Sequence, residues 1–293
     1  MNVLPKIALT AGDPAGIGPE IVAKAANDAA VRAVCEPVIF ESKVDATVRP
    51  GEVSAAAGLS AYNTIVRAVD AARLGEVDAI ATAPVNKLAF AEAGLPWKGH
   101  TDLLAHLCGD VPVAMMFHSP QLKVVLLTVH VPLRDVPSLI TADLLDQTLT
   151  LTIAAMRTFG IDSPRLAVAG LNPHAGESGV IGSEDDAVLA PAVQRAQQRG
   201  VTIAGPIPGD TVFVRAVRGE FDCVVACYHD QGLIPVKLLG FGQAVNVTIG
   251  LPIIRTSVDH GTAFDIAGQD KADPGSMIAA VTLAAQMVSM RRR

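Results

Sequence analysis

The sequence predicts a doubly wound α/β fold, in which helices cover both faces of a parallel sheet. Short apolar runs alternate along the chain with longer segments whose apolar residues return every three or four positions. The short runs are rich in Val, Ile, Leu and Ala without a period of two, which is typical of strands buried on both faces. Aromatic residues make up only 4% of the chain, so the core is expected to be aliphatic.

Each predicted element follows from one of these two patterns. The apolar runs expected to form strands are residues 7–10, 37–40, 78–82, 113–117, 122–129, 165–169, 222–228 and 244–248. The segments with helical periodicity are residues 19–34, 61–74, 142–159, 184–199 and 276–290. Pro19 and Glu20 suit a helix start, because the first turn needs no proline N–H and its dipole attracts a carboxylate. Gly160 and Gly200 are typical of helix ends.

Charge, hydropathy and cysteine usage argue against several classes of protein. The formal net charge is -6. The one basic run, Arg291 to Arg293, is typical of a solvated tail, so no nucleic-acid partner is expected. Neither a signal segment nor a stretch of about 18 apolar residues is visible, so neither export nor membrane insertion is expected. The cysteines form no CxxC pair and are expected to be buried thiols in the cytoplasm: Cys35, Cys108, Cys223 and Cys227.

A glycine-rich motif, Gly12 to Glu20, follows the first predicted strand and opens the first predicted helix. Its glycines allow the backbone to approach a ligand near a helix N-terminus, although a tight turn without a ligand is an alternative. The motif is not GxGxxG. Asp13 argues against simple phosphate binding, because a carboxylate repels a phosphate.

Three histidines each follow a predicted apolar strand: His130, His174 and His229. A single histidine at a strand end is more often structural than functional. The carboxyl ends of parallel strands meet at one edge of a sheet, so three such residues predict a site for Zn²⁺ or a similar divalent ion. Three nitrogen ligands would leave a coordination position for a substrate oxygen.

Several polar residues in apolar or glycine-rich surroundings are candidate anion ligands. Thr101, in the string Gly99 to Asp102, is a candidate cap for a helix over residues 103–107, whose N–H groups would receive an anion. The alternative is a capped surface helix. Lys237, Asn246 and Arg255 recur at nine-residue intervals. Such isolated polar and cationic residues bind phosphate or carboxylate, or only keep a surface soluble.

Two further segments are weaker candidates. Residues 258–268 contain two glycines, Gly261 and Gly268, and we interpret them as a cofactor-binding loop rather than assigning His260 as a metal ligand. Asp210 is a candidate for proton transfer or for orienting a metal ligand, with a plain helix cap before Thr211 as the alternative.

Taken together, these strings resemble the 4-hydroxythreonine-4-phosphate dehydrogenase family, from Ile7 to Ala285. The matching strings are residues 12–20, 82–87, 99–104, 171–177, 228–233 and 255–268. The first and last also resemble isopropylmalate and isocitrate dehydrogenases, where the last loop holds the adenosine part of the cofactor. The resemblance implies two α/β/α lobes with a central cleft and no Rossmann fingerprint. The first lobe would comprise residues 1–112 with 256–293, and the second would comprise residues 113–255.

The resemblance also assigns roles to individual residues. The implied ligands of a divalent metal, Zn, Mg or Co, are His130, His174 and His229. The implied substrate-binding residues are His100, Thr101, Lys237, Asn246 and Arg255. NAD or NADP would bind the last loop, through Gly261, Thr262 and Asp265. A homodimer is implied, with the active site at its interface and the metal ligands shared between subunits.

The implied reaction is oxidation and decarboxylation of 4-phosphohydroxy-L-threonine to 3-amino-2-oxopropyl phosphate in pyridoxal 5'-phosphate biosynthesis. Relatives that oxidise threonate or erythronate 4-phosphate share most of these motifs, and a cis-dihydrodiol dehydrogenase is a further alternative. In that last relative the Gly-His-Thr string is altered, so its retention here favours a phosphorylated substrate. A non-catalytic sugar-phosphate-binding or metal-binding protein is the alternative from another class. The segment from Glu41 to Val53 is shorter than in the family, which affects the first lobe.

Overall fold

The computed structural model describes residues 3–43, 46–240 and 242–292. The chain forms two compact units, which we call unit 1 (residues 1–113 and 245–293) and unit 2 (residues 114–244). The chain returns to unit 1 at residue 245 rather than near 256, because strand β9 (Val245–Ile249) pairs with strand β10 (Ile254–Ser257). Asn246 and Arg255 therefore belong to unit 1.

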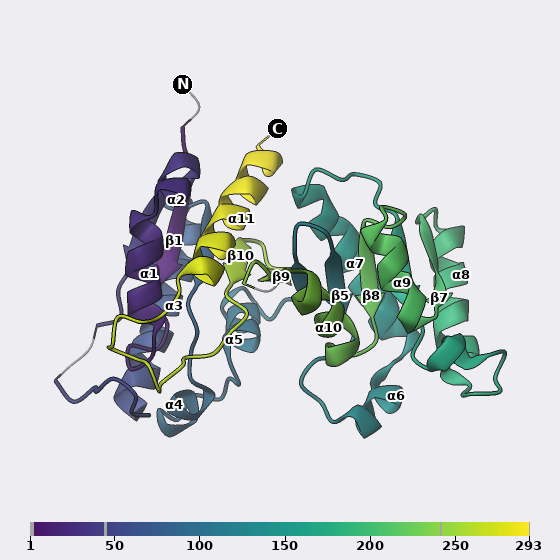
Figure 1. Ribbon diagram of the computed structural model, residues 1–293, viewed down its shortest axis with the longest axis horizontal. Coiled ribbons are helices and arrows are strands. Elements are labelled where there is room, and N and C mark those ends of the chain that lie inside the picture. The colour runs from purple at the N-terminus through teal and green to yellow at the C-terminus, as the bar shows by residue number, and fades with distance from the viewer. Residues whose placement is uncertain (1–2, 44–45, 241, 293) are drawn as a thin grey trace. The chain divides into compact units, whose positions relative to one another are not determined.

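Within unit 1 the strand order is β2-β1-β3-β10-β9. Strands β1, β9 and β10 are labelled in Figure 1. Strands β1 (Lys6–Thr10), β2 (Glu36–Phe40), β3 (Ala79–Thr82) and β10 are parallel, and β9 runs antiparallel to β10. The helices are α1 (Gly18–Asn27), α2 (Ala29–Val34), α3 (Ala55–Arg73), α4 (Lys87–Glu92), α5 (His100–Leu107) and α11 (Gly275–Arg291).

The two faces of this sheet are covered by different helices. Ala8 and Ile80 lie in a buried cluster with Ile65 of α3, Phe90 of α4 and Leu103 of α5. On the opposite face, α11 packs against β3 and β10. Residues that pair with one another on neighbouring strands point to the same face of the sheet. Arg255, which pairs with Ile80, therefore points to the face covered by α3 and α5.

The pairing of neighbouring strands brings four polar residues into one row at an edge of unit 1. Thr10 pairs with Thr82, Thr82 with Ser257, and Ser257 with Asn246. Thr10, Thr82 and Ser257 are the last residues of parallel strands, so this row lies at the carboxyl edge of the sheet, the usual place for ligands in α/β folds. Arg255 lies on the same face, two residues before Ser257.

Within unit 2 the strand order is β4-β5-β8-β6-β7. Strands β5 (Lys123–Leu126), β8 (Cys223–Ala226), β6 (Leu166–Ala169) and β7 (Ile203–Ile207) are parallel, whereas β4 (Ala114–His118) is antiparallel to β5. The helices are α6 (Val136–Leu139), α7 (Ala142–Thr158), α8 (Ala190–Gln198), α9 (Gly209–Val217) and α10 (His229–Gly240). Shorter turns are 3₁₀ at Leu133–Asp135 and Pro173–Gly176, and π-helical at Asp185–Leu189.

The α/β fold class is confirmed, with specific corrections. The pairing is mixed rather than all parallel in both units, because β9 is antiparallel to β10 and β4 is antiparallel to β5. The helix predicted over residues 19–34 divides at Asp28, whose carboxylate accepts hydrogen bonds from the N–H groups of Ala30 and Val31 and starts α2. Strands β7 and β10 were not predicted, because Gly205 and Pro206 interrupt the first and the second is largely polar.

All four cysteines are free thiols. Cys35, Cys223 and Cys227 are buried free thiols, and burial raises the pKa of each. Cys108 is only partly buried, contrary to the expectation. Among the described residues no single helix is long and apolar enough to cross a membrane, although Leu133–Leu139 and Ala142–Thr158, bent by 90°, meet the same length and composition test as a pair.

Candidate functional site

Two of the three histidines predicted to bind metal lie side by side in unit 2. His130 follows β5, and His229 begins α10 after β8. Because β5 and β8 are parallel neighbours, their carboxyl ends are adjacent, and the two ring centroids are 5.6 Å apart. The rings line a cavity of about 280 Å³ together with Val129 and Tyr228. These two imidazoles are therefore neighbours at adjacent strand ends, as the strand-end argument expects; their role as metal ligands stays a prediction.

The third histidine does not join them in a single chain. His174 lies in the turn that follows β6, with its side chain 65% exposed and its Nδ1 2.8 Å from Glu177 Oε2. Its φ of 52° lies in the left-handed region, as do those of Ala175 and Glu177. Among the described residues there is no group of three His, Cys, Asp or Glu side chains that could hold a metal ion. A complete three-histidine site therefore requires a ligand beyond this pair.

The donor chemistry of the pair fits a divalent transition metal. His229 Nδ1 lies 2.7 Å from Asp230 Oδ1, which leaves its Nε2 as the coordinating nitrogen. A carboxylate on the second ring nitrogen is the usual partner of a metal-bound histidine, because it fixes the tautomer and the ring orientation. Imidazole nitrogens favour zinc or cobalt over magnesium, which prefers oxygen ligands.

Two residues not predicted from the sequence fix the backbone around these histidines. The buried Asp185 carboxylate accepts hydrogen bonds from the backbone N–H groups of Leu171 (2.8 Å) and Asn172 (3.0 Å). Gln231 accepts from Cys227 N and donates to the Gly170 carbonyl, at 2.7 Å each, so it ties the end of β8 to the end of β6. Gln231 lies in residues 228–233, one of the strings that match the family, so its importance could have been inferred. Asp185 lies between two other acidic residues, a pattern typical of a solvent-exposed helix face.

Two further predicted site residues, Asp210 and Lys237, also belong to unit 2. Asp210 is exposed and is the second residue of α9, and the residue before that helix is Pro208, so Asp210 is not a cap. Lys237 is partly exposed and lies eight residues after His229 on α10.

The carboxyl edge of unit 1 holds a buried arginine. Arg255 is 2% exposed, its Nη1 donates to Thr248 Oγ1 (2.8 Å), and its Nη2 donates to Thr82 Oγ1 (2.6 Å). Its Nε is buried without a hydrogen-bond partner. Burial lowers the pKa of Arg255 to about 9, so the guanidinium still carries its charge at neutral pH.

His100 and Asn246 add two more unsatisfied atoms to this edge. Burial, and then the charge of Arg255, lower the pKa of His100 well below its usual range, so the imidazole is neutral at pH 7. His100 Nε2 and Asn246 Oδ1 are buried without a hydrogen-bond partner among the described residues. Buried polar atoms are nearly always satisfied, so several orphans at one sheet edge indicate a polar ligand. The structure thus brings together three of the predicted substrate-binding residues.

Thr101 is close to this edge in sequence but does not cap its helix. Helix α5 begins at His100, the residue before it is Gly99, and no side chain caps the helix. Instead, Asp102 accepts a hydrogen bond from the backbone N–H of Lys98. Thr101 is the second helical residue and is partly buried.

The glycine-rich turn and the predicted cofactor loop are in contact within unit 1. Ile17 N donates to the Thr262 carbonyl (3.0 Å), and a Cβ on Gly16 would lie 2.8 Å from that same oxygen, so only glycine fits there. Asp13 closes the turn by accepting from Ala15 N (2.9 Å), and burial raises the pKa of its carboxyl. This explains how a carboxylate can stand in the motif. Of the predicted cofactor residues, Gly261 and Asp265 are exposed and Thr262 is partly buried.

The shortened segment lies against both of these features. Gly51 N donates to the Ala15 carbonyl (2.7 Å), and Ser42 Oγ donates to the Gly12 carbonyl (2.8 Å). A Cβ on Gly51 would lie 2.9 Å from the Phe264 carbonyl. Residues 44–45 of the segment lie outside the described residues.

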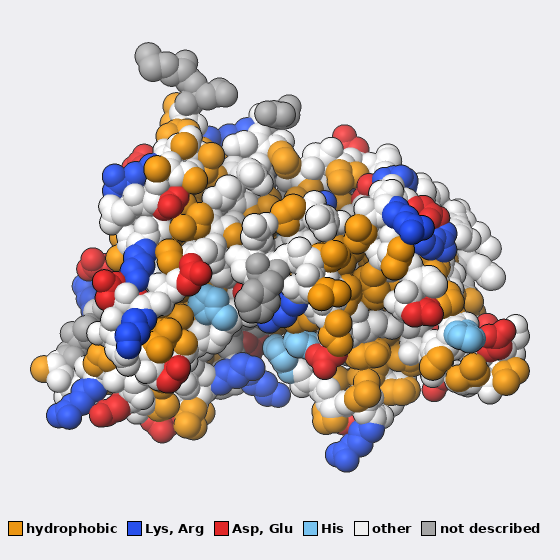
Figure 2. All heavy atoms as spheres, in the orientation of Figure 1, with side chains coloured by type: hydrophobic (Ala, Val, Ile, Leu, Met, Phe, Trp, Pro, Cys, Tyr) orange, Lys and Arg blue, Asp and Glu red, His pale blue; other side chains and the backbone are white. Residues whose placement is uncertain are grey.

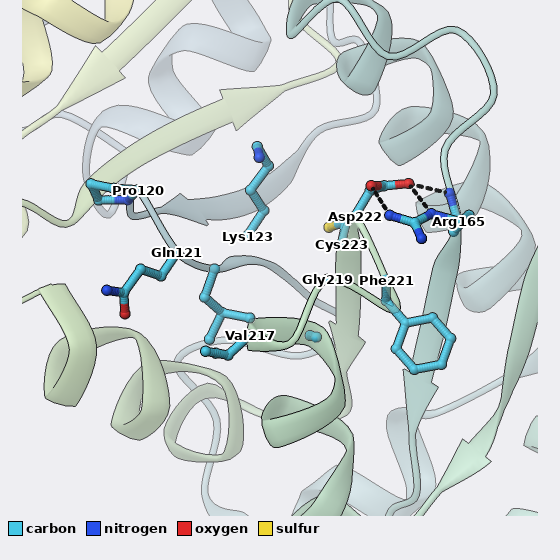
Figure 3. A pocket seen from close by; sticks show the side chains of 11 residues that line it. Pro120, Gln121, Lys123, Arg165, Val217, Gly219, Phe221, Asp222 and Cys223 are labelled. Carbon is cyan, nitrogen blue, oxygen red and sulfur yellow. Dashed lines mark hydrogen bonds and ion pairs between the residues drawn. The ribbon is translucent and has the colours of Figure 1, made fainter.

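A larger cavity of about 460 Å³ lies elsewhere in unit 2 (Figure 3). Its lining includes Lys123 and Cys223, which begin β5 and β8, so it lies at the amino edge of the sheet, opposite to the histidines. Figure 3 shows Arg165 paired with Asp222 through two parallel contacts. Ligands of α/β sheets bind at carboxyl ends, so this cavity is not the candidate active site.

Comparisons with known proteins give a consistent result. The family model described as "Pyridoxal phosphate biosynthetic protein PdxA" matches residues 13–284. A 4-hydroxythreonine-4-phosphate dehydrogenase of Paracoccus denitrificans (strain Pd 1222) is 45% identical over 316 residues, covering 97% of this chain and 98% of the relative. A D-threonate 4-phosphate dehydrogenase of Cupriavidus necator is 41% identical over 330 residues, covering 99% of both chains.

Solved structures show the same relationship. A 4-hydroxythreonine-4-phosphate dehydrogenase from Klebsiella pneumoniae has a TM-score of 0.89 at 40% identity, covering 98% of this chain and 99% of that one. An isocitrate dehydrogenase from Methylococcus capsulatus has a TM-score of 0.52 at 15% identity, covering 99% of this chain and 86% of that one. The second comparison concerns the fold alone, and it confirms the predicted isocitrate dehydrogenase-like architecture.

Proposed function

Because the chain belongs to the PdxA family of pyridoxal phosphate biosynthetic proteins, we propose that it is a metal-dependent NAD(P) dehydrogenase acting on 4-phosphohydroxy-L-threonine. The observation that carries the proposal is the edge of unit 1, where a buried, charged Arg255 lies with the unsatisfied atoms of His100 and Asn246. Arginine with neutral polar neighbours is suited to a phosphate or carboxylate group. Thr101 and Lys237 complete the proposed substrate-binding set.

The proposed reaction has two stages. The hydride of the substrate's C–H group passes to NAD(P)⁺ and the hydroxyl proton is released, which gives a ketone β to the carboxylate. Loss of CO₂ leaves an enolate, whose protonation yields 3-amino-2-oxopropyl phosphate. Asp210 is the proposed group for proton transfer, because its carboxylate is exposed to solvent and can exchange protons with it.

The proposed metal ligands are His130 and His229 of one chain, together with His174 of a second chain. These residues would hold a divalent ion, which would supply Lewis-acid chemistry by lowering the pKa of the substrate alcohol and polarising the developing carbonyl. The chain's own contribution is orientation, through Asp230 on the His229 ring. NAD or NADP is proposed to bind at Gly261, Thr262 and Asp265, and the free cysteines favour a cytoplasmic location.

A homodimer with the active site at its interface is proposed from the incomplete histidine set and from an apolar helix surface. Helix α10 begins with His229 and exposes Ile234 (65%) and Leu238 (83%). Figure 2 shows apolar side chains gathered over the helices of unit 2 on the face in view. Contiguous exposed apolar residues mark protein contacts, so a second subunit covering α10 would lie beside the His229 end of the metal site.

Mixing two inactive variants tests this arrangement. His130→Ala and His174→Ala should each be inactive, because each lacks one metal ligand. If His174 comes from the partner, a heterodimer of the two keeps one complete site, made of His130 and His229 from one chain and His174 from the other. Random reassociation should therefore restore up to about a quarter of wild-type activity.

The matched control for this experiment is a mixture of His130→Ala with His229→Ala. These two rings lie together in one chain, so no heterodimer of that pair contains a complete site. Complementation by the control pair, or none by the first pair in demonstrated dimers, would contradict the proposed sharing.

A substrate panel tests the function itself. NAD(P)H absorbance is followed with 4-phosphohydroxy-L-threonine, D-threonate 4-phosphate and erythronate 4-phosphate, with a divalent metal and then after chelation. The amino substrate should have a kcat/KM at least about tenfold higher, because an unmatched charged contact costs roughly 1–3 kcal/mol. A preference for D-threonate 4-phosphate would instead assign the activity of the relative from Cupriavidus necator. No turnover of any of the three would contradict the dehydrogenase proposal.

A further inference from the structure

The guanidinium of Arg255 is held from both sides by neutral hydroxyls. Its own strand, β10, lies between β3 and β9, and each neighbour supplies one threonine on the same face. Nη2 donates to Thr82 Oγ1 of β3 at 2.6 Å, and Nη1 donates to Thr248 Oγ1 of β9 at 2.8 Å. All three side chains are buried, so these contacts are shielded from water.

The Thr82 hydroxyl is itself fixed in direction. It accepts from Arg255, so its single proton is donated onward, to Ser257 Oγ at 3.0 Å. Ser257 Oγ in turn donates to the Thr82 carbonyl at 3.2 Å. This relay places the lone pairs of Thr82 toward the guanidinium and limits the rotation of its hydroxyl.

These contacts hold the arginine without neutralising it. No ion pair among the described residues includes Arg255, although a buried arginine usually has a carboxylate partner. A carboxylate would fix the side chain equally well but would compete with an anionic ligand. Two hydroxyls leave the full positive charge available, and Nε remains an unused donor.

We propose that Thr82 and Thr248 are positioning residues, which orient the uncompensated guanidinium of Arg255 toward the anionic group of the ligand. The inference rests on the proposed function for the identity of the substrate, but not for the existence of an anion site. Fixing the guanidinium before binding removes the conformational cost that a free arginine side chain would incur on binding.

The test compares valine variants of three buried threonines in the full-length protein. Thr82→Val and Thr248→Val each remove one contact with Arg255 while keeping the side-chain shape. Thr256→Val is the matched control, since Thr256 is equally buried in β10 but lies on the opposite face, where its hydroxyl donates to the Ala280 carbonyl. The probe is inorganic phosphate, and its Kd is measured by calorimetry.

Thr82→Val and Thr248→Val should each raise the Kd for phosphate by about tenfold, as expected for one lost hydrogen bond to a charged group. Thr256→Val should leave the Kd for phosphate within about twofold of the wild-type value. Thr82→Ser, which keeps the hydroxyl, should have a Kd close to that of the wild type. In an Arg255→Ala background, Thr82→Val should have no further effect, because it acts through Arg255. If Thr82→Val does not fold, Thr82→Ala gives the same comparison.

Equal phosphate affinities in the three valine variants would overturn the inference, as would an undiminished effect of Thr82→Val without Arg255. Neither result depends on turnover. Where the wild-type enzyme oxidises the phosphorylated substrate, the same variants should raise its KM and leave the KM for NAD(P) unchanged. A wild-type protein that binds phosphate with this dependence but oxidises none of the panel would support the inference and contradict the proposed function.

Discussion

Replacing His229 by Ala is expected to abolish metal binding and turnover while the fold remains intact. The change removes one of two imidazoles whose centroids lie 5.6 Å apart, so only His130 and the proposed third ligand, His174, remain, and the pair that holds the ion is broken. Removing only the hydrogen-bond partner of a metal ligand lowers metal affinity or activity by roughly 10–100-fold, and removing the ligand itself should lower them further. Metal content after dialysis against Zn²⁺, measured with kcat/KM, checks the expectation.

His106→Ala is the control for this variant. His106 is a half-exposed histidine of unit 1 whose Nδ1 lies 2.9 Å from Asp110, and it has no role in the proposed site. It should retain the wild-type metal content. A His229→Ala protein with unchanged metal stoichiometry would show that the ion, if bound, lies elsewhere.

Replacing Arg255 by Lys is expected to weaken binding of the phosphorylated substrate by roughly 1–3 kcal/mol, or about one to two powers of ten. Lysine keeps the charge but offers a single nitrogen. The hydroxyls of Thr82 and Thr248 lie on the two strands that flank β10. A single nitrogen cannot donate to both hydroxyls and also to a ligand. The KM for substrate should rise, and the KM for NAD(P) should stay normal.

Arg165→Lys is the corresponding control. Arg165 makes two parallel contacts with Asp222, but this pair is partly exposed and lines the cavity at the amino edge of unit 2. Surface pairs of this kind contribute little, so both Michaelis constants should be unchanged. An unaltered substrate KM in Arg255→Lys would argue strongly against an anion site at Arg255.

The site was predictable to the extent that it follows from strand ends. His130 and His229 follow apolar runs that contain β5 and β8, and the parallel pairing of these two strands makes their ends neighbours. His174 also follows a strand, but the position of its side chain depends on a turn with left-handed residues at 174, 175 and 177. Such a turn, and any ligand from a second chain, leave no periodic signal in one sequence.

Arg255 was a candidate anion ligand from the sequence, but the strand that carries it was not predicted. Strand β10 contains Arg255, Thr256 and Ser257 among its four residues, and this polarity argues for a loop when the sequence is read by hydrophobicity. The strand is buried because Thr256 finds the Ala280 carbonyl on one face and Arg255 finds two hydroxyls on the other. Those partners lie far apart in sequence, so only the fold reveals them.

The discontinuity of unit 1 has a consequence for biosynthesis. Unit 2 is formed from one continuous segment, so all of its strands exist once residue 244 has been translated. Unit 1 lacks β10, which lies between β3 and β9, until residue 257 has followed, and it lacks α11 for longer still. During that interval the edge of β3 has no neighbour beyond it, and unpaired strand edges are sites of aggregation in nascent chains. Unit 2 can therefore fold during synthesis while unit 1, the half that carries Arg255, completes its sheet last.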